Sequence, residues 1–159
     1  MLLSRPDISG PVSRVVSGGQ SGVDRAALEV ARSLGIPLGG WCPAGGAAED
    51  VPDVRALFPE LQETSSADPA ERTRRNVADS DATLVLVAGR LASPGTATTL
   101  ASAVRLGRPH LLADVRHASV VRAWLARLDR PVLNVAGPRE SESPGIHDAA
   151  AALLRDVLA

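Results

Sequence analysis

The segment Val12–Leu34, which reads VSRVVSGGQSGVDRAALEVARSL, decides the expected fold. Val12–Val16 is a short β-branched run of the kind found in buried strands. The glycine-rich stretch Ser17–Gly22 then turns the chain into Val23–Leu34, whose helical pattern ends at Gly35, a residue that commonly ends helices. A strand, a glycine turn and a helix in this order are typical of the first unit of a Rossmann-type α/β domain.

The rest of the chain repeats this alternation. We expect further strands at Ile36–Gly40, Thr83–Ala88, His110–Ala113 and Val132–Val135, and further helices at Asp68–Ala78, Ala97–Leu106, Ala118–Leu128 and Ile146–Leu158. Because strands and helices alternate, right-handed crossovers should connect parallel strands and place helices on both faces of the sheet. The predicted fold class is therefore α/β, a Rossmann-like doubly wound parallel sheet of about five strands flanked by helices. Its expected strand order is 2-1-3-4-5.

The length and composition are those of one domain. A chain of 159 residues has the common size of a single domain, which we expect over residues 12–159, after a loose N-terminal tail at residues 1–11. Hydrophobic residues make up 45% and aromatic residues only 2%, so aliphatic side chains must build the core. The stretch Trp41–Ser66 has little periodicity and is expected to be a long loop.

Charge and cysteine content exclude several classes of protein. The 17 Lys+Arg against 18 Asp+Glu lack the basic excess of nucleic-acid-binding proteins, so a bound anion should be small. No apolar run reaches the roughly 18 residues of a membrane span, and residues 1–6 lack the apolar stretch of a signal peptide, so we expect none. The single Cys42 and three histidines are not spaced as zinc ligands. We expect a cytoplasmic protein with no nucleic-acid partner, no membrane segment and no structural metal.

The first glycine turn is a candidate phosphate-binding loop. Glycines lack Cβ atoms and let a phosphate approach the backbone, while the following helix offers free N–H groups and the positive end of its dipole. The candidate residues are Gly18, Gly19, Gln20, Ser21, Gly22, Val23, Asp24 and Arg25. A tight turn that needs glycine only for its dihedral angles would look the same. The loop lacks the Lys-Ser/Thr ending of an NTPase loop, and Gly39-Gly40 has no acidic residue for a ribose, which disfavours ATPases and ordinary NAD dehydrogenases.

A second glycine turn, Ser93–Thr96, precedes the helix Ala97–Leu106. Its candidate binding residues are Gly95, Thr96, Ala97, Thr98 and Thr99, of which the threonines offer hydroxyl groups to a phosphate or sugar. Thr96 and Thr98 would also serve as plain helix caps.

Three more polar residues are candidates for the same ligand. Arg72 and Asn76 lie four positions apart on one helical face, so one ligand can meet both. Arg139 follows the last predicted strand, at the rim of the expected cleft. Each also has a plain structural explanation, an exposed helix face for the first two and a local ion pair for Arg139.

Four separated motifs together resemble one family. They are residues 18–26 (GGQSGVDRA), 39–43 (GGWCP), 76–83 (NVADSDAT) and 134–141 (NVAGPRES). In this order they are similar to the putative molybdenum carrier proteins, over about residues 12–158. The resemblance implies a Rossmann-like fold, assembly into a dimer or tetramer, and a role in binding molybdenum cofactor (molybdopterin), a pterin with a phosphate group.

The wider superfamily includes the lysine-decarboxylase-like phosphoribohydrolases, which cleave nucleoside monophosphates. Their loop reads Pro-Gly-Gly-x-Gly-Thr-x-x-Glu, and residues 94–99 are similar but shorter. Thr99 stands where the resemblance would place the catalytic Glu, and a threonine cannot replace a carboxylate at neutral pH. Binding without catalysis is therefore the expectation, and the sequence identifies no catalytic residue.

Three functions stay open. The first is a binding or carrier protein for a phosphate-containing cofactor or nucleotide. The second is a nucleotide N-glycosidase in which Glu49 or Asp50 replaces the missing Glu, and the third is a sensor of a nucleotide signal. In each case the partner is a phosphate-bearing small molecule. Apolar positions on more than one side of Ala97–Leu106 also predict a homo-oligomer.

Overall fold

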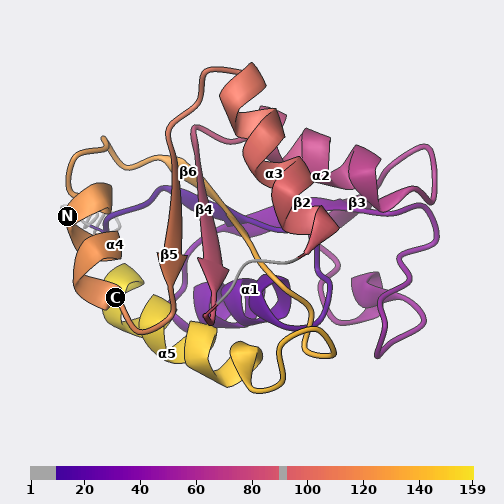
Figure 1. The fold of residues 1–159 in the computed structure, drawn as a ribbon. Helices are drawn as coiled ribbons and strands as arrows, with labels where there is room; N and C mark the ends of the chain where they lie inside the picture. The colour runs from indigo at the N-terminus through magenta and orange to yellow at the C-terminus, as the bar shows by residue number, and fades with distance from the viewer. Residues whose placement is uncertain (1–9, 90–92) are drawn as a thin grey trace, which may run out of the picture.

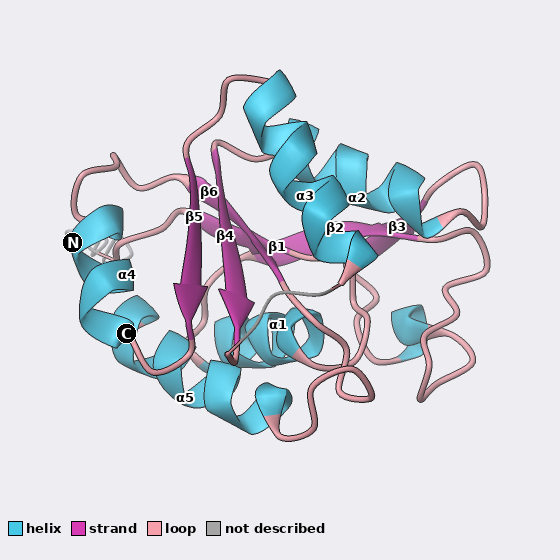
Figure 2. Ribbon diagram, viewed as in Figure 1, coloured by secondary structure: helices cyan, strands magenta, loops and turns pink. Residues whose placement is uncertain are grey.

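The structure, a computed structural model, describes residues 10–89 and 93–159 of the chain. These residues form one parallel sheet with helices on both of its faces (Figures 1 and 2). The strands are β1 (Arg14–Val16), β2 (Leu38–Cys42), β3 (Leu61–Glu63), β4 (Ala82–Val87), β5 (His110–Asp114) and β6 (Val132–Ala136). The helices are α1 (Val23–Ser33), α2 (Pro69–Ala78), α3 (Pro94–Arg105), α4 (Ala118–Leu125) and α5 (Ile146–Leu158), with a short 3-10 helix, η1 (Val54–Ala56).

The expected elements form for local reasons. Helix α2 begins as its sequence indicates, because the Asp68 side chain accepts a hydrogen bond from the N–H of Ala70 at 3.0 Å and Pro69 is the first helical residue. All six residues of β4 are buried, as the continuous apolar run of a central parallel strand predicts. The α/β fold class is therefore confirmed.

The sheet has six strands where about five were expected. The additional strand, β3, lies inside the stretch Trp41–Ser66 that was expected to be a loop. Its Leu61 packs with Leu28, Val54 and Phe58 in a small apolar cluster of its own. Three residues are too few to show an alternating pattern, so this strand forms through tertiary packing and parallel pairing with β2.

The expected strand order is wrong, because the last strand of the chain lies in the middle of the sheet. The observed order is β3-β2-β1-β6-β4-β5, with Val16 opposite Asn134 and Asn134 opposite Thr83. The first and third expected strands, β1 and β4, are therefore separated by β6. Each strand was assigned from local periodicity, which carries no information about its neighbours in the sheet.

The sheet is nevertheless doubly wound. When β6 is counted as strand one and the others follow in chain order, the observed order reads 4-3-2-1-5-6. The numbers then rise outward in both directions from β6, and the winding direction reverses between β6 and β4. Ligands of doubly wound sheets bind beyond the carboxyl ends of the strands at such a reversal.

The two faces of the sheet differ in polarity. Helices α1, α4 and α5 cover one face, and α2 and α3 cover the other (Figure 1). The main core lies under the first group and includes Val15, Leu84 and Leu133, all fully buried. The opposite face carries the buried polar side chains of Thr83 and Asn134. Polar groups thus lie inside the protein near the point where the winding reverses.

Residues 1–11 were expected to be a loose tail, and of these, residues 1–9 lie outside the described residues. Among the helices of the described residues, none combines the length and the apolar character that crossing a membrane requires.

Candidate functional site

A small cleft of about 50 Å³ opens at the carboxyl ends of β1 and β6, beside α2 and the first turn of α3. Six of the residues proposed from the sequence line it, namely Gly18, Asp24, Arg72, Asn76, Gly95 and Thr99. Pockets for whole cofactors are usually several hundred Å³, whereas this volume suits one group the size of a phosphate. Most of a larger ligand would therefore lie at the mouth of the cleft.

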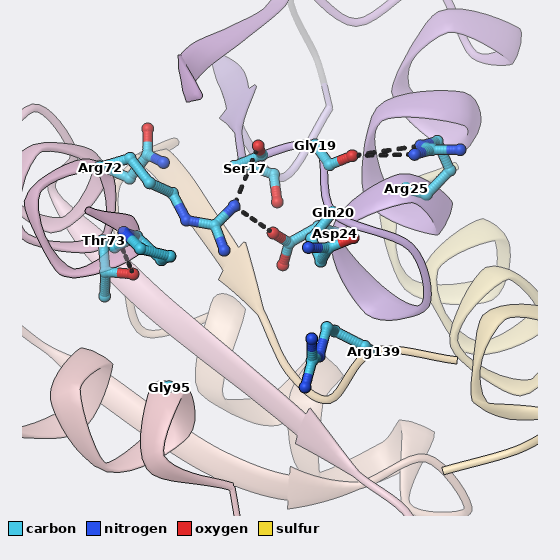
Figure 3. Close-up of polar contacts among 12 residues, drawn as sticks. Ser17, Gly19, Gln20, Asp24, Arg25, Arg72, Thr73, Gly95 and Arg139 are labelled. Carbon is cyan, nitrogen blue, oxygen red and sulfur yellow. Dashed lines mark hydrogen bonds and ion pairs between the residues drawn. The ribbon is translucent and has the colours of Figure 1, made fainter. Parts of the chain in front are cut away.

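Asp24 and Arg72 are the two charged side chains among the described residues of the cleft wall. The Arg72 guanidinium reaches from α2 to the start of α1, where its Nη1 lies 3.4 Å from Oδ2 of Asp24 and 3.1 Å from the carbonyl oxygen of Gly18 (Figure 3). Burial raises the pKa of Asp24 above its usual value, and Arg72 offsets part of that rise. The other N–H groups of Arg72 have no hydrogen-bond partner within the described residues, so they remain available to a ligand.

Two asparagines of the cleft have different roles. Asn76 accepts a hydrogen bond from the N–H of Trp41 at 2.8 Å and donates to its carbonyl oxygen at 3.0 Å, so its amide ties α2 to β2. Asn134 of β6 is only 2% exposed, and its one contact is long, 3.4 Å from Nδ2 to Oγ1 of Thr83. Within the described residues its amide thus has hydrogen-bonding capacity left for a ligand.

Sequence reasoning did not propose Asn134, Thr73 or Gly137, which also line the cleft. A signal for Asn134 was present, because an amide is unusual between the apolar residues of a central strand. It was missed because the last strand was expected at the edge of the sheet, away from the cleft.

Gly18 and Gly19 face different surroundings. A side chain at Gly18 would collide with the Arg72 guanidinium, so the missing Cβ makes room for this arginine. Gly19 has φ of 79° and faces Val54 and Leu61, on the side of the small apolar cluster. Gly18 therefore belongs to the cleft, and Gly19 belongs to the packing beneath the loop.

Three other proposed loop residues, Gln20, Ser21 and Arg25, contact the segment Glu49–Asp50. Gln20 accepts hydrogen bonds from the N–H groups of Ser21 and Glu49, both at 2.9 Å, and the Ser21 hydroxyl donates to Glu49. Arg25 forms a two-pronged ion pair with Asp50 at 2.9 Å. Glu49 and Asp50, the proposed replacements for the missing Glu, are thus held outside the cleft wall.

Gly22, Val23 and Arg139 also lie away from the cleft wall. Gly22, with φ of 79°, leaves no room for a Cβ beside the carbonyl oxygen of Pro138, and Val23 is fully buried. Arg139 is about half exposed and pairs with Glu142 at 3.1 Å. Arg139 is therefore paired with Glu142 and is not one of the residues that line the cleft.

The second glycine turn contributes the start of α3. Thr99 lines the cleft with Gly95, and its hydroxyl donates to the carbonyl oxygen of Gly95 at 3.0 Å. Thr98 donates in the same way to Pro94 at 3.1 Å, and Ala97 is exposed. Thr96 is 2% exposed, and its hydroxyl has no partner within the described residues. Only Gly95 and Thr99 of this turn therefore reach the cleft.

The cleft offers hydrogen-bond donors and acceptors rather than metal ligands. No group of three or more His, Cys, Asp or Glu side chains that could hold a metal ion occurs in the described parts of the chain. Cys42 is buried in the small apolar cluster, and its burial raises the pKa of its thiol.

Comparisons with known proteins agree with this architecture. Residues 15–158 match the family described as cpYpsA, the circularly permutated YpsA SLOG family. A crystal structure of a putative molybdenum carrier protein from Syntrophus aciditrophicus SB is similar, with a TM-score of 0.85 and 37% identity. The similarity covers 94% of this chain and 97% of that chain. No curated protein matches. The match over nearly the whole chain, together with a last strand in the middle of the sheet, shows that the chain belongs to the circularly permutated YpsA SLOG family.

Proposed function

We propose that the protein binds a phosphate-bearing small molecule, a nucleotide or molybdenum cofactor, and acts as a binding or carrier protein. The observation that carries this proposal is the position of Arg72, which lines a phosphate-sized cleft where the winding of the sheet reverses and has N–H groups without a partner among the described residues. Gly95, in the first turn of α3, lines the same cleft and has open space where a side chain would be. An anion there would also gain from the positive end of the helix dipole.

The similar crystal structure supports the choice of ligand. It is described as a putative molybdenum carrier protein, which favours molybdenum cofactor as one candidate. A nucleotide is the second candidate. The cleft has room for one phosphate group, so the remainder of either ligand would lie outside it.

The arrangement of carboxylates favours binding over hydrolysis. Thr99 lines the cleft where the related hydrolases carry Glu, and Asp50 is neutralised by Arg25. Asp24 is the only carboxylate in the described cleft wall, and burial raises its pKa, as would suit an acid or base catalyst. N-glycosidase activity through Asp24 is therefore the second candidate function. Release of free base from AMP, GMP or CMP, measured by chromatography, would favour it.

The proposal is tested by replacing Arg72 and titrating with AMP in a calorimeter. Arg72→Gln should weaken binding at least about tenfold, because a charge-assisted hydrogen bond to phosphate is lost. The matched control is Arg74→Gln, since Arg74 is exposed on the same helix and should leave affinity unchanged. Equal affinity of both variants would show that the cleft is not the phosphate site. Native mass spectrometry of the purified protein would identify any ligand that co-purifies.

A further inference from the structure

We infer that Asp24 accepts a hydrogen bond from a hydroxyl group of the ligand, so that the cleft selects a sugar phosphate over a phosphate ester without hydroxyl groups. The inference rests on the proposed function, since it assigns the chemical group that lies beside the bound phosphate. The ribose of a 5′-nucleotide carries such hydroxyl groups, of which the 3′-hydroxyl is nearest to the phosphate.

The Asp24 carboxylate has hydrogen-bond acceptor positions that the protein does not use. Its contact with Arg72 is 3.4 Å long, whereas strong ion-pair hydrogen bonds are about 2.7–2.9 Å. The hydroxyl of Ser17 donates to the carbonyl oxygen of Val135 at 2.6 Å and also lies close enough to Asp24 to interact with its carboxylate. The N–H of Gln20 also interacts with the carboxylate. A carboxylate offers about four acceptor positions, so Arg72, Gln20 and Ser17 together still leave one free for a ligand.

This carboxylate is also buried in the wall of the cleft. The side chain of Asp24 is 9% exposed and lines the cleft. A buried carboxylate with few donors is unfavourable, and a ligand that supplies a donor removes that penalty. A phosphate ester without a hydroxyl group brings the same negative charge but no donor, so it leaves the carboxylate unsatisfied. Asp24 thus favours the binding of a phosphate ester with a hydroxyl group over one without.

The two side chains proposed to bind the ligand, Arg72 and Asp24, lie close together. Arg72 and Asp24 are in contact, so the phosphate bound by Arg72 and the hydroxyl bound by Asp24 must be close together in the ligand. The cleft of about 50 Å³ cannot hold a whole sugar, so the hydroxyl group must be the one nearest to the phosphate in the ligand. Asn134, with its free amide capacity, can bond either group.

The test compares glycerol 3-phosphate with propyl phosphate, which differ only in two hydroxyl groups. Calorimetry on the wild-type protein should show about tenfold tighter binding of glycerol 3-phosphate, the effect of one hydrogen bond to a charged group. In Asp24→Asn this ratio should fall towards one, because a neutral amide oxygen accepts a weaker hydrogen bond from the hydroxyl group than a carboxylate does, whereas the loss of the charge affects both esters alike. The matched control is Asp148→Asn on α5, whose side chain is 95% exposed and which should keep the wild-type ratio.

Each result decides the inference. Equal affinity of the wild-type protein for both esters would overturn it and leave the proposed phosphate site intact. A tenfold preference that persists in Asp24→Asn would show that another residue binds the hydroxyl groups, which also overturns it. Binding of neither ester would overturn both the inference and the proposed function. The wild-type comparison does not depend on the folding of any variant.

Discussion

The adjacent glycines Gly18 and Gly19 show how residues of one type in one motif come to serve different purposes. Gly18 makes room for Arg72 in the cleft, whereas Gly19 turns the chain with φ of 79° above the small apolar cluster. A glycine-rich loop is therefore not a binding loop at every position. Substitutions at the two glycines should act on different properties, ligand binding for Gly18 and folding for Gly19.

We predict that Gly19→Ala destabilises the fold by about 1–3 kcal/mol, because a Cβ there needs an unfavourable φ and lies only 2.9 Å from Leu61 and 3.0 Å from Val54. Urea unfolding measures the loss. Gly95→Ala is the control, since its Cβ would meet nothing closer than Ser93 at 3.6 Å in a helix. Unchanged stability of Gly19→Ala would contradict the prediction, because it would show that the surrounding side chains and the backbone accommodate a Cβ at this position.

Among the elements, α5 is the last helix of the chain, and it packs against α1, the first helix. His147 near the start of α5 lies 2.7 Å from Glu29 of α1 and 2.9 Å from Asp148. Burial lowers the pKa of His147, but the hydrogen bonds to Asp148 and Glu29 outweigh burial and raise it above 6.5. This helix is where a pH dependence of stability is expected.

His147→Gln should lower the free energy of unfolding by at most about 1 kcal/mol at pH 5.5 and leave it nearly unchanged at pH 9. A raised pKa in the folded state stabilises the protein below the unfolded value, and that stability is lost as pH rises through the folded value. Urea unfolding at both pH values measures the difference. His110→Gln, at an exposed histidine of β5, is the control for the replacement of a histidine by glutamine. An equal loss at both pH values would mean that packing, not charge, is the contribution of His147.

Helix α3 and strand β5 leave apolar side chains uncovered at one end of the molecule. Val104 is 64% exposed and Leu112 is 41% exposed, and β5 is the edge strand of the sheet. Ala97 and Ala101 of α3 are exposed as well. These residues agree with the expectation that α3 is apolar on more than one side.

For the whole molecule, we predict a homo-oligomer that covers this end. Light scattering at micromolar concentration should give at least twice the 16.4 kDa chain mass. Ala101→Glu should shift the protein towards the monomer, because it would bury an unpaired charge in the contact. Ala152→Glu is the matched control, an exposed alanine on α5 across the sheet. A monomeric wild-type protein over this range would contradict the prediction.

Local sequence determined the types of the elements and the α/β class, because the periods of helices and strands and the glycine turns are short-range properties. It also predicted Asp24, Arg72 and Gly95 as candidate binding residues, and all three line the cleft. Only the tertiary structure decided that β6 lies between β1 and β4, that Asn134 lines the cleft, and that Arg72 contacts Asp24 from a distance of 48 residues in the chain. The physical reason is that strand order and side-chain contacts depend on how distant segments pack, which no local pattern records.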